Sequence, residues 1–417
     1  MDGCAWVKHA GHACHLLRPK KVSMKEHVAV IGAGITGIIA AYYLVKSGYQ
    51  VTVFEQESYP AMRTSYANGG QVSVSNSEVW TTWGNVRKGI KWMLQKDAPL
   101  LIRPAPSWSK IKWMARFLKH TVMGDYARNT ATTIRLGLES RSLYQEIIEA
   151  EGLSFDQTFC GILHVYKDEN YFQAAQSVKE LYTANGCEWD ILTPMQSMSL
   201  DPALHAFGDL VGGAWTPGDW TGDIHKFCVE LTRILEERYQ VKFCFDTKID
   251  KFTAREMQVD YDAVVVSAGI GSVEIAGYFG DSLPIYPVKG YSITVNVRPE
   301  DMQYVPRVSI LDDQAKIVTS TLGNRLRVAG TAELAGENYD IRRDRIEPLL
   351  RWVEENFPEI DASDYSSWAC LRPMSPDMMP IVTTSKTPAV YYHTGHGHLG
   401  WTLSPATAQQ LIRLMRG

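Results

Sequence analysis

The apolar and polar positions of the chain first fall into a regular pattern at Val28. A run of apolar residues from Val28 to Ile31 predicts a buried strand, which a glycine turn and a helix reaching Val45 follow. After Gly48, the segment Gln50–Phe54 predicts a second strand. This succession predicts the beginning of a βαβ unit, the building block of a parallel sheet.

The middle of the chain has a different pattern. Residues 76–145 are rich in tryptophan, lysine and arginine, and they predict an inserted region of amphipathic helices. A strand at Gly161–Tyr166 and a helix near Tyr171–Asn185 are expected next. Four further segments then predict consecutive antiparallel strands in a separate sheet. These segments are Tyr286–Val297, Val308–Leu311, Lys316–Ser320 and Arg325–Gly330.

Two other segments return the chain to strands followed by helices. Tyr261–Ser267 predicts a buried strand, and Ala389–His393 predicts another one near the C-terminus. A glycine turn and a helix from about Ser404 complete the chain. Residues 1–24, by contrast, are expected to form a flexible N-terminal extension.

Length and composition are those of a globular protein with two domains. The chain has 417 residues, of which 45% are hydrophobic and 21% charged, and a net charge of -4 argues against nucleic-acid binding. The seven cysteines are scattered and include no Cys-x-x-Cys pair, so neither a disulfide framework nor a metal site is predicted and a cytoplasmic location is favoured. The longest apolar runs have the length of strands, far below the roughly 18 residues of a membrane-spanning helix.

A glycine-rich turn between the first strand and the first helix carries the first chemical signal. It consists of Gly32, Ala33, Gly34, Ile35, Thr36 and Gly37. Glycines at this spacing permit a tight turn and let a pyrophosphate approach the backbone amides at the helix N-terminus. Glu55 ends the second strand 18 residues after Gly37, where a carboxylate accepts hydrogen bonds from ribose hydroxyls and disfavours the 2′-phosphate of NADP. A bound dinucleotide is therefore predicted.

The glycine turn alone leaves NAD and FAD open, but the layout of the chain favours FAD. A dehydrogenase that uses NAD usually completes its nucleotide-binding fold with contiguous βα units. Here the next strands of that kind follow only after about 150 residues of other material, which does not suit that layout.

Four ordered segments make the prediction more specific. They are Thr64–Gln71, Pro287–Ser292, Leu371–Asp377 and Thr394–Thr402. Together they resemble the small subunit of bacterial D-amino-acid dehydrogenases, within the wider family of D-amino-acid, glycine and sarcosine oxidases, and the resemblance extends from about Val28 to the C-terminus.

The resemblance implies an α/β fold class. It predicts a discontinuous Rossmann-like FAD-binding domain and an α+β substrate domain that contains an antiparallel sheet. Residues 25–79, 205–280 and 367–417 are expected in the FAD-binding domain, and residues 80–204 and 281–366 in the substrate domain.

The resemblance also implies FAD contacts beyond the glycine turn and Glu55. The expected residues are Gln56, Thr64, Ser65, Asn68, Gly69, Gly70, Gln71, Ile249, Ala268, Gly269, His396, Gly397, His398, Leu399, Gly400, Trp401 and Thr402. Small polar residues let backbone amides reach phosphate and ring oxygens, and a helix N-terminus after the last loop favours negative charge on the reduced ring. For Ile249, expected in a strand pair after Val241, a place in the sheet core is an equal alternative.

Substrate recognition is expected at Arg372, because a planar guanidinium matches a carboxylate with two hydrogen bonds and the matching family position binds the substrate α-carboxylate. Lys316, His398 and Tyr291 complete the expected catalytic set, with Lys316 as a second cation for the carboxylate. Cys370 stands where glycine is expected. It suggests either a covalent thioether to the flavin or a packed, inert side chain.

The implied function is oxidative deamination of a D-amino acid to a 2-oxo acid and ammonia. Hydride passes from Cα to flavin N5, which needs no catalytic base when the amine is neutral, and a quinone or another acceptor takes the electrons. One alternative is a secondary-amine oxidase or dehydrogenase acting on sarcosine, glycine or hydroxyproline. A non-enzymatic alternative is an FAD-binding sensor.

Residues 86–119 form an unusually basic segment, with nine basic residues, one acidic residue and interleaved tryptophans. Such a segment suits the surface of an anionic membrane, which predicts peripheral contact with the inner face of the bacterial cell membrane and access to a quinone. The alternative is a solvated helix face whose tryptophans lie in the core.

Overall fold

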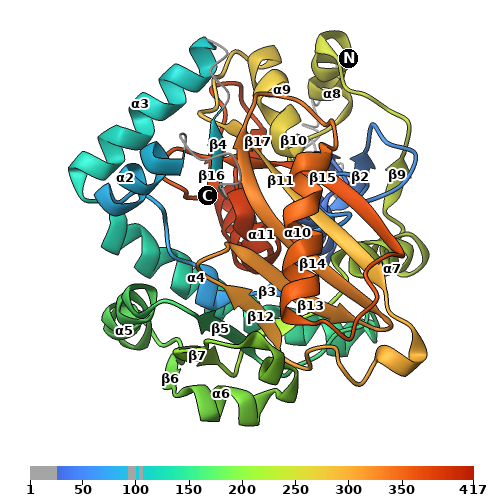
Figure 1. Ribbon diagram of the computed structural model, residues 1–417. Helices are drawn as coiled ribbons and strands as arrows, with labels where there is room; N and C mark the ends of the chain where they lie inside the picture. Colours follow the sequence, from blue (N-terminus) through green and yellow to red (C-terminus); the bar gives the residue numbers. More distant parts are fainter. Residues whose placement is uncertain (1–25, 93–99, 103–106) are drawn as a thin grey trace, which may run out of the picture.

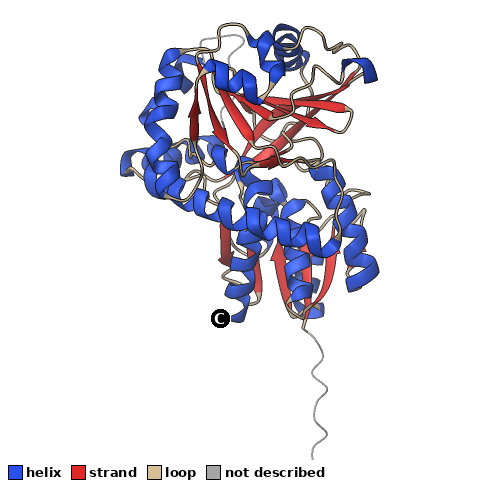
Figure 2. Ribbon diagram, turned by 90° about the horizontal axis from the view of Figure 1, so that it is seen from below, coloured by secondary structure: helices blue, strands red, loops and turns tan. Residues whose placement is uncertain are grey.

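The computed structural model describes residues 26–92, 100–102 and 107–417. The expected extension 1–24 lies outside the described residues, as do parts of the basic segment 86–119. Two sheets organise the described chain, and Figure 2 shows them as two lobes, each covered by helices.

The smaller sheet has six strands in the order β16-β17-β10-β1-β2-β9. Their bounds are β1 (His27–Ile31), β2 (Gln50–Phe54), β9 (Lys242–Cys244), β10 (Ala263–Val266), β16 (Ile381–Thr384) and β17 (Val390–Thr394). All neighbours pair in parallel except β16, which is antiparallel to β17. Val28 to Ile31 are buried because helices cover both faces of the sheet, as parallel sheets require. The βαβ prediction is confirmed.

Helix α1 (Ile35–Lys46) connects β1 to β2 and packs against the C-terminal helix α11 (Gly400–Arg416). Helix α11 begins four residues before the expected Ser404, because the short helix η5 (Gly397–Leu399) leads directly into it. Helix α7 (Ile224–Tyr239) packs on α1, and the long α4 (Tyr126–Glu151) packs on α11.

The larger sheet contains nine strands, eight of which follow the order β15-β11-β14-β13-β12-β5-β7-β6 while β4 pairs with β14. Their bounds are β4 (Leu100–Ile102), β5 (Ile162–Tyr166), β6 (Asp190–Leu192), β7 (Gly212–Thr216), β11 (Tyr286–Asn296), β12 (Ser309–Asp312), β13 (Ile317–Leu322), β14 (Arg325–Leu334) and β15 (Tyr365–Met374). The four expected strands are all present, but the sheet is not purely antiparallel, because β5 and β4 join β12 and β14 in parallel. Pairings between segments so far apart in the sequence leave no local signal.

One face of the larger sheet is covered by α10 (Arg343–Asn356), which crosses β11 and β14 in Figure 1. Tyr291, Ile293 and Val295 point from β11 into the apolar cluster beneath this helix. We call this side the α10 face and the other the inner face. Residues of β11 alternate between the two, so Val288, Gly290 and Ser292 belong to the inner face.

The remaining elements surround the two sheets. They are β3 (Gln71–Val72), η1 (Val74–Asn76), α2 (Trp83–Trp92), α3 (Trp108–Met123), α5 (Glu169–Ala184), α6 (Pro194–Leu200), η2 (Pro202–Phe207), β8 (Trp220–Thr221), α8 (Lys251–Asp260), η3 (Gly269–Gly271), α9 (Ser272–Tyr278) and η4 (Pro299–Asp301). The expected strand pair around Ile249 is wrong, since Ile249 lies between β9 and α8 and is buried against the small sheet. Segment 205–280, which was expected in the FAD-binding domain, supplies strands to both sheets. The expected boundaries between the two domains stay a prediction.

Candidate functional site

The glycine turn after β1 is shaped by close backbone contacts. Gly32 has φ +106°, and a Cβ there would lie 2.6 Å from the carbonyl oxygen of Ser267. A Cβ on Gly37 would lie 1.8 Å from the carbonyl oxygen of Gly32. Glycine is therefore required at both positions, and the turn presents bare backbone toward a bound group.

The N-terminus of α1 is left open for an anion. Gly34 is its N-cap, no side chain caps the helix, and its first turn has no acidic residue. The backbone N–H of Ile35 donates to Ser65 Oγ at 3.1 Å, which joins the 64–71 loop to the turn. Unpaired amides at a helix N-terminus bind phosphate groups, so this end of α1 suits the pyrophosphate of FAD.

Glu55 is held in position at the end of β2. Its Oε2 accepts the Ala33 N–H at 2.7 Å and its Oε1 accepts the Glu57 N–H at 3.0 Å. Each carboxylate oxygen keeps further acceptor capacity for ribose hydroxyls. Gln56 follows Glu55 and is exposed. Ala268 and Gly269, at the end of β10, border the glycine turn, because the Ala268 Cα lies 3.0 Å from a Cβ built on Gly32.

Four consecutive carbonyls of the 64–71 loop are bonded to the neighbouring structure. The carbonyl oxygens of Ala67, Asn68, Gly69 and Gly70 accept from Ser292 Oγ, Arg327 Nη1, Ser320 Oγ and the Gly222 N–H, at 2.7 to 2.9 Å. In a trans peptide the N–H points opposite to the carbonyl. The N–H groups of Asn68 and Gly69 therefore point away from the larger sheet, toward the side where the flavin is expected.

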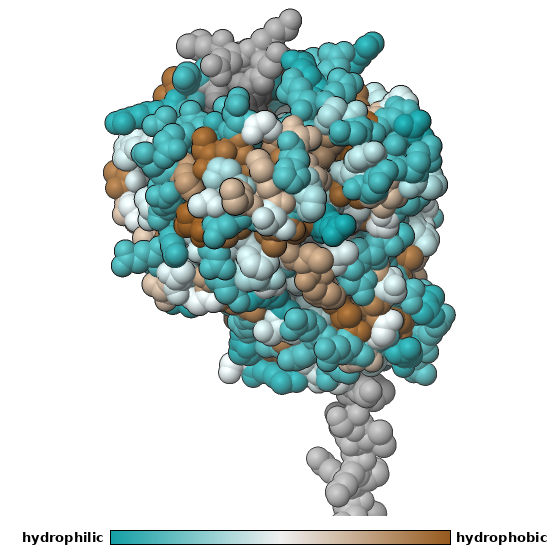
Figure 3. All heavy atoms as spheres, turned by 60° about the horizontal axis from the view of Figure 1, so that its bottom comes forward, coloured by the Kyte–Doolittle hydropathy of each residue, from teal (hydrophilic) through white to brown (hydrophobic). Residues whose placement is uncertain are grey.

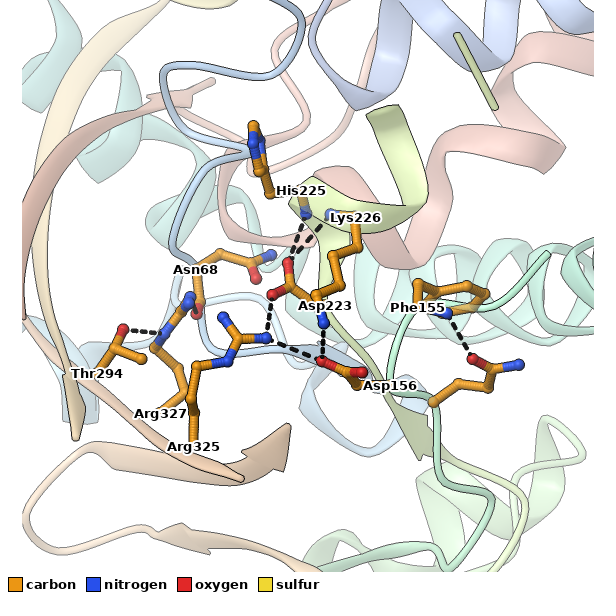
Figure 4. A network of polar contacts seen from close by, with 10 residues as sticks. Asn68, Phe155, Asp156, Asp223, His225, Lys226, Thr294, Arg325 and Arg327 are labelled. Atoms are coloured by element: carbon orange, nitrogen blue, oxygen red, sulfur yellow. Dashed lines mark hydrogen bonds and ion pairs between the residues drawn. The ribbon is translucent and has the colours of Figure 1, made fainter. Parts of the chain in front are cut away.

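Arg327 anchors this loop from the inner face of β14. Its Nε donates to Thr294 Oγ1 at 2.7 Å and its Nη1 to the Asn68 carbonyl at 2.9 Å (Figure 4). Burial lowers the pKa of Arg327 to about 10. Arg325, on the same side of β14, binds Asp156 and Asp223 at 2.8 Å each. These contacts join the larger sheet to the start of α7.

Asp223 is the N-cap of α7. It accepts the backbone N–H groups of His225 and Lys226 at 2.9 and 3.2 Å, as Figure 4 shows. Because its other carboxylate oxygen binds Arg325, one side chain both caps the helix and fixes the sheet beside the 64–71 loop.

Arg372 lies on the inner face of β15, opposite Val288. A Cβ on Gly290 would lie 2.4 Å from its Nη2, so the guanidinium passes directly over that glycine. Its Nη1 donates to the Thr331 carbonyl at 3.1 Å, and within the described chain no carboxylate lies at ion-pair distance from it. Burial lowers the pKa of Arg372 to about 10. A buried cation without a counter-ion suits an anionic ligand.

His398 lies beside Arg372 and is held as a neutral ring. Burial, followed by the charge of Arg372, lowers the pKa of His398 to about 4. Its Nε2 lies 3.3 Å from the Asn76 carbonyl, which makes Nε2 the protonated nitrogen, and Trp80 stacks on the ring at 5.1 Å between centroids. His398 therefore lies near Arg372 without adding a competing positive charge.

Two glycines shape the loop that carries His398. Gly395 and Gly397 have φ +72° and +60°, and a Cβ on Gly397 would lie 2.7 Å from Met374 Sδ. His396 is buried, with its Nε2 2.9 Å from Thr407 Oγ1. Like α1, helix α11 begins without a side-chain cap or an acidic residue, at Gly400.

The last residues of the expected FAD loop pack within the protein. The side chains of Leu399 and Trp401 are in apolar clusters, and Thr402 Oγ1 accepts the Ser73 N–H at 3.1 Å. Their side chains therefore position the start of α11.

Lys316 reaches the same region from the turn before β13. It has φ +56°, and its Nζ donates to Asp313 Oδ1 at 2.9 Å. Ile317 is paired with Gly330, so Lys316 lies next to Thr331, whose carbonyl binds Arg372. The structure thus brings Lys316 close to Arg372 along the sheet, with its ammonium engaged by Asp313.

Tyr291 is separated from this group. It lies on the α10 face, and its hydroxyl donates to Glu333 Oε2 at 2.6 Å. Arg372 extends from the inner face, so the sheet itself stands between the two side chains. The expected catalytic role of Tyr291 is corrected accordingly, because its position in the strand alternation directs it into the core beneath α10.

Cys370 lies two residues before Arg372, on the inner face. Its Sγ is 3.3 Å from Thr64 Oγ1, which also donates to the Leu371 carbonyl at 2.9 Å. Burial raises the pKa of the Cys370 thiol. Thr64 and Cys370 thus join the FAD loop to β15, and the choice between a thioether link and a packed thiol stays a prediction.

Comparison with known proteins decides the family. The model of the family described as FAD dependent oxidoreductase matches residues 27–414. The chain belongs to this family. FAD is therefore its cofactor and oxidoreduction its chemistry, which confirms the expectation of FAD over NAD.

Two relatives are similar over nearly the whole chain. D-amino acid dehydrogenase 3 of Mesorhizobium japonicum is 48% identical over 402 residues, covering 93% of this chain and 96% of that protein. D-amino acid dehydrogenase of Agrobacterium fabrum is 35% identical over 403 residues, covering 94% and 96%. These likenesses confirm the family resemblance inferred from the four sequence segments.

Solved structures share the fold at low sequence identity. Glycine oxidase from Bacillus cereus has a TM-score of 0.69 at 19% identity, covering 94% of this chain and 95% of that chain. L-proline dehydrogenase from P. horikoshii has a TM-score of 0.71 at 15% identity, covering 94% and 93%. The expected α/β fold class is confirmed.

Sequence reasoning missed four residues of this region: Trp80, Glu78, Arg327 and Thr331. Glu78 and Trp80 fall in a stretch expected to be helical, whereas they lie in the loop between η1 and α2. In the sequence, nothing distinguishes Arg327 from any other arginine in a strand. The place of Thr331 depends on a β-bulge in β14, which sequence alternation does not show.

Proposed function

We propose that this chain is a D-amino acid dehydrogenase that converts a D-amino acid to a 2-oxo acid and ammonia. The buried guanidinium of Arg372 carries the proposal, since no described carboxylate pairs with it and the α-carboxylate of the substrate would supply the missing counter-ion. The names of the two relatives support the same substrate class. Bound FAD supplies the two-electron acceptor for the hydride that leaves Cα.

The residues of the chain have separate tasks in this proposal. Arg372 binds the carboxylate through its planar fork and so orients Cα. His398 is neutral because of burial and the charge of Arg372, and Trp80 stacks on its ring; together they would shield the bound carboxylate from water. The bonded carbonyls of the 64–71 loop keep its N–H groups fixed toward the cofactor. No side chain of the chain is required to remove a proton once the amine is neutral.

An anaerobic reduction screen tests the proposal. The purified holoenzyme is mixed with D-amino acids, L-amino acids, sarcosine and hydroxyproline, and bleaching of the flavin absorbance is recorded. We expect bleaching by D-amino acids. Bleaching by sarcosine or hydroxyproline alone would move the chain to the secondary-amine enzymes, and no bleaching by any of these compounds would favour a sensor. Peroxide formation in air would contradict a dehydrogenase and indicate an oxidase.

We further propose that α3 rests on an anionic membrane surface, where a quinone accepts the electrons. Trp108, Ile111, Leu118 and Val122 are exposed along this helix, Trp108 by 78% and Val122 by 68%. Their spacing of three, seven and four residues puts them on one side of a helix. Figure 1 shows α3 along the outer edge of the molecule.

Basic side chains flank this apolar stripe. Lys112, Arg116 and Lys119 are exposed on α3, which suits anionic lipid headgroups. Trp113 instead donates from Nε1 to the Met374 carbonyl at 2.8 Å and anchors the helix to β15. The side chain of Trp92 lies outside the described residues. None of the described helices is long and apolar enough to cross a membrane. Hydrophilic residues cover most of the molecular face that Figure 3 shows.

Vesicle flotation tests this second proposal. We expect the protein to bind phosphatidylglycerol vesicles at low salt and to dissociate as salt increases, because screening weakens the attraction. Val122→Ser and Trp108→Ser should weaken binding, while Val259→Ser, at an exposed apolar position on α8, should not. No binding of the wild type at low salt would refute the proposal.

A further inference from the structure

A second group of charged side chains lies near Arg372. Asp313 binds Lys316 Nζ through Oδ1 and His164 Nδ1 through Oδ2, both at 2.9 Å. His164 belongs to the inner face of β5, because its neighbours Leu163 and Val165 point into the cluster beneath α10. Glu78 interacts electrostatically with Asp313, Lys316 and His164, so its carboxylate faces the same group. We call Glu78, His164, Asp313 and Lys316 the polar cluster.

Two connections place the polar cluster near Arg372. Lys316 lies next to Thr331, whose carbonyl holds Arg372. Glu78 is two residues from Trp80, which stacks on His398, so the Cα atoms of Glu78 and Trp80 are at most about 7 Å apart. A substrate whose carboxylate lies on Arg372 therefore has the polar cluster within reach of a long side chain.

Solvent reaches the polar cluster at Lys316. Lys316 exposes 45% of its side chain to solvent. Burial lowers the pKa of Lys316, but the charge and hydrogen bond of Asp313 oppose this effect, and the pKa is raised overall. His164 is buried and Glu78 is partly buried, so the polar cluster extends from the interior of the protein to a point that solvent reaches.

Within the cluster, the charges of Asp313 and Lys316 are already compensated. Although burial opposes them, Lys316 and His164 hold the pKa of Asp313 well below its usual range. Lys88, the other nearby cation, lies 4.4 Å from the centre of the Tyr171 ring. The carboxylates of Asp313 and Glu78 also act on Lys88, but none of the described ion pairs joins Lys88 to either of them.

Glu78 differs from these groups. Its Oε1 accepts the Tyr126 hydroxyl at 3.0 Å, and no Lys or Arg among the described residues lies within ion-pair distance of it. Burial raises the pKa of Glu78, so its ionised form lacks full compensation. A cation bound at Glu78 would supply this compensation.

We propose that Glu78 forms the end of the substrate side-chain subsite and binds a cationic side chain, of the D-arginine or D-lysine class. This inference rests on the proposed D-amino acid dehydrogenase function. Arg372 takes the α-carboxylate at one end of the substrate, and Glu78 accepts hydrogen bonds from the guanidinium or ammonium at the other. The two anchors select substrates by length and charge.

The test compares substrates of similar length and different charge. For Glu78→Gln, we expect kcat/KM for D-arginine and D-lysine to fall about 10-fold or more, because a charge-assisted hydrogen bond is lost. For D-methionine we expect a change below about 3-fold. Glu78→Asp, which keeps the charge, should retain the preference for cationic substrates, and Glu149→Gln on the exposed side of α4 should change nothing.

Two results would overturn the inference. One is an equal loss for all substrates, which would mean that Glu78 acts on the common α-amino group. The other is a wild-type enzyme that oxidises D-methionine as well as D-arginine. Either result leaves the dehydrogenase proposal standing, whereas no flavin reduction by any D-amino acid would refute that proposal itself. Flavin absorbance of each variant confirms that it is folded and loaded.

Discussion

Replacing Arg372 by methionine tests the substrate site most directly. The substitution keeps a long side chain over Gly290 but removes the charge and the donors. In the free protein, ionised Arg372 is unfavourable, because burial lowers its pKa from the ordinary value of arginine to about 10. One pKa unit corresponds to about 1.4 kcal/mol, so this burial costs the folded state roughly 3 kcal/mol.

The sign of this effect follows from linkage. A base whose pKa is lower in the folded state destabilises that state at every pH below the folded pKa, here about 10. The cost disappears as the pH rises from there to the ordinary pKa of arginine. At pH 7 the cost is fully present. Arg372→Met should therefore leave Tm unchanged or raise it, despite the lost hydrogen bond to Thr331.

Activity should change in the opposite direction. A carboxylate held by both arms of the guanidinium makes two charge-assisted hydrogen bonds, together about 3 to 6 kcal/mol. Their loss corresponds to roughly a 100- to 10,000-fold lower kcat/KM. Arg372→Lys keeps a charge but loses the fork, and we expect an intermediate loss.

The assay is steady-state oxidation of a D-amino acid with an artificial electron acceptor, together with thermal unfolding and flavin absorbance. A loss in kcat/KM below about 10-fold for Arg372→Met, with full flavin content, would refute the carboxylate assignment. A large fall in Tm would show instead that Arg372 has a structural partner that compensates its charge.

Three further predictions concern the cofactor and pH. Gly37→Ala should abolish FAD binding, read as flavin content after purification, because its Cβ would lie 1.8 Å from the Gly32 carbonyl oxygen; retained FAD would contradict the tight turn. His398, with a pKa of about 4, is neutral above pH 6, so His398→Gln should leave the pH profile between 6 and 9 unchanged; a lost ionisation in that range would contradict its neutral state. If Cys370 carries the flavin, acid precipitation leaves the yellow colour with the wild-type protein and releases it from Cys370→Ser; full release from both would establish a packed thiol.

Local features of the fold were predictable from sequence. The βαβ unit and the glycine turn depend on residues within about 30 positions, and the backbone contacts at Gly32 and Gly37 explain why glycine is needed there. Arg372 was found through a segment shared with a family. The parallel pairing of β5 with β12 could not be predicted, since it joins segments more than 140 residues apart.

The face of a strand toward which a side chain points was the hardest property to predict. Tyr291 and Gly290 are neighbours in one family-like segment, yet one lies beneath α10 and the other under Arg372. The alternation of side chains along a strand separates the residues of its two faces, but it does not say which face meets the cofactor. The bulge at Thr331 adds a residue to β14, and the pairing of β14 with β11 determines where it lies. Because Thr331 lies between Lys316 and Arg372, the approach of these two side chains also depends on tertiary structure.

Arg327 and Arg372 show how one chemical group can have two different tasks on the same face of a sheet. Burial lowers the pKa of both to about 10, so desolvation disfavours both cations. Arg327 donates from Nε to Thr294 and from Nη1 to the Asn68 carbonyl, and its position is fixed from both sides. Arg372 has a single bond to the Thr331 carbonyl among the described residues, which leaves its remaining donors for a ligand. Burial alone therefore does not identify the substrate residue. The unsatisfied part of the guanidinium supports the proposed role of Arg372, because the free energy spent in desolvating it is recovered only when an anion binds.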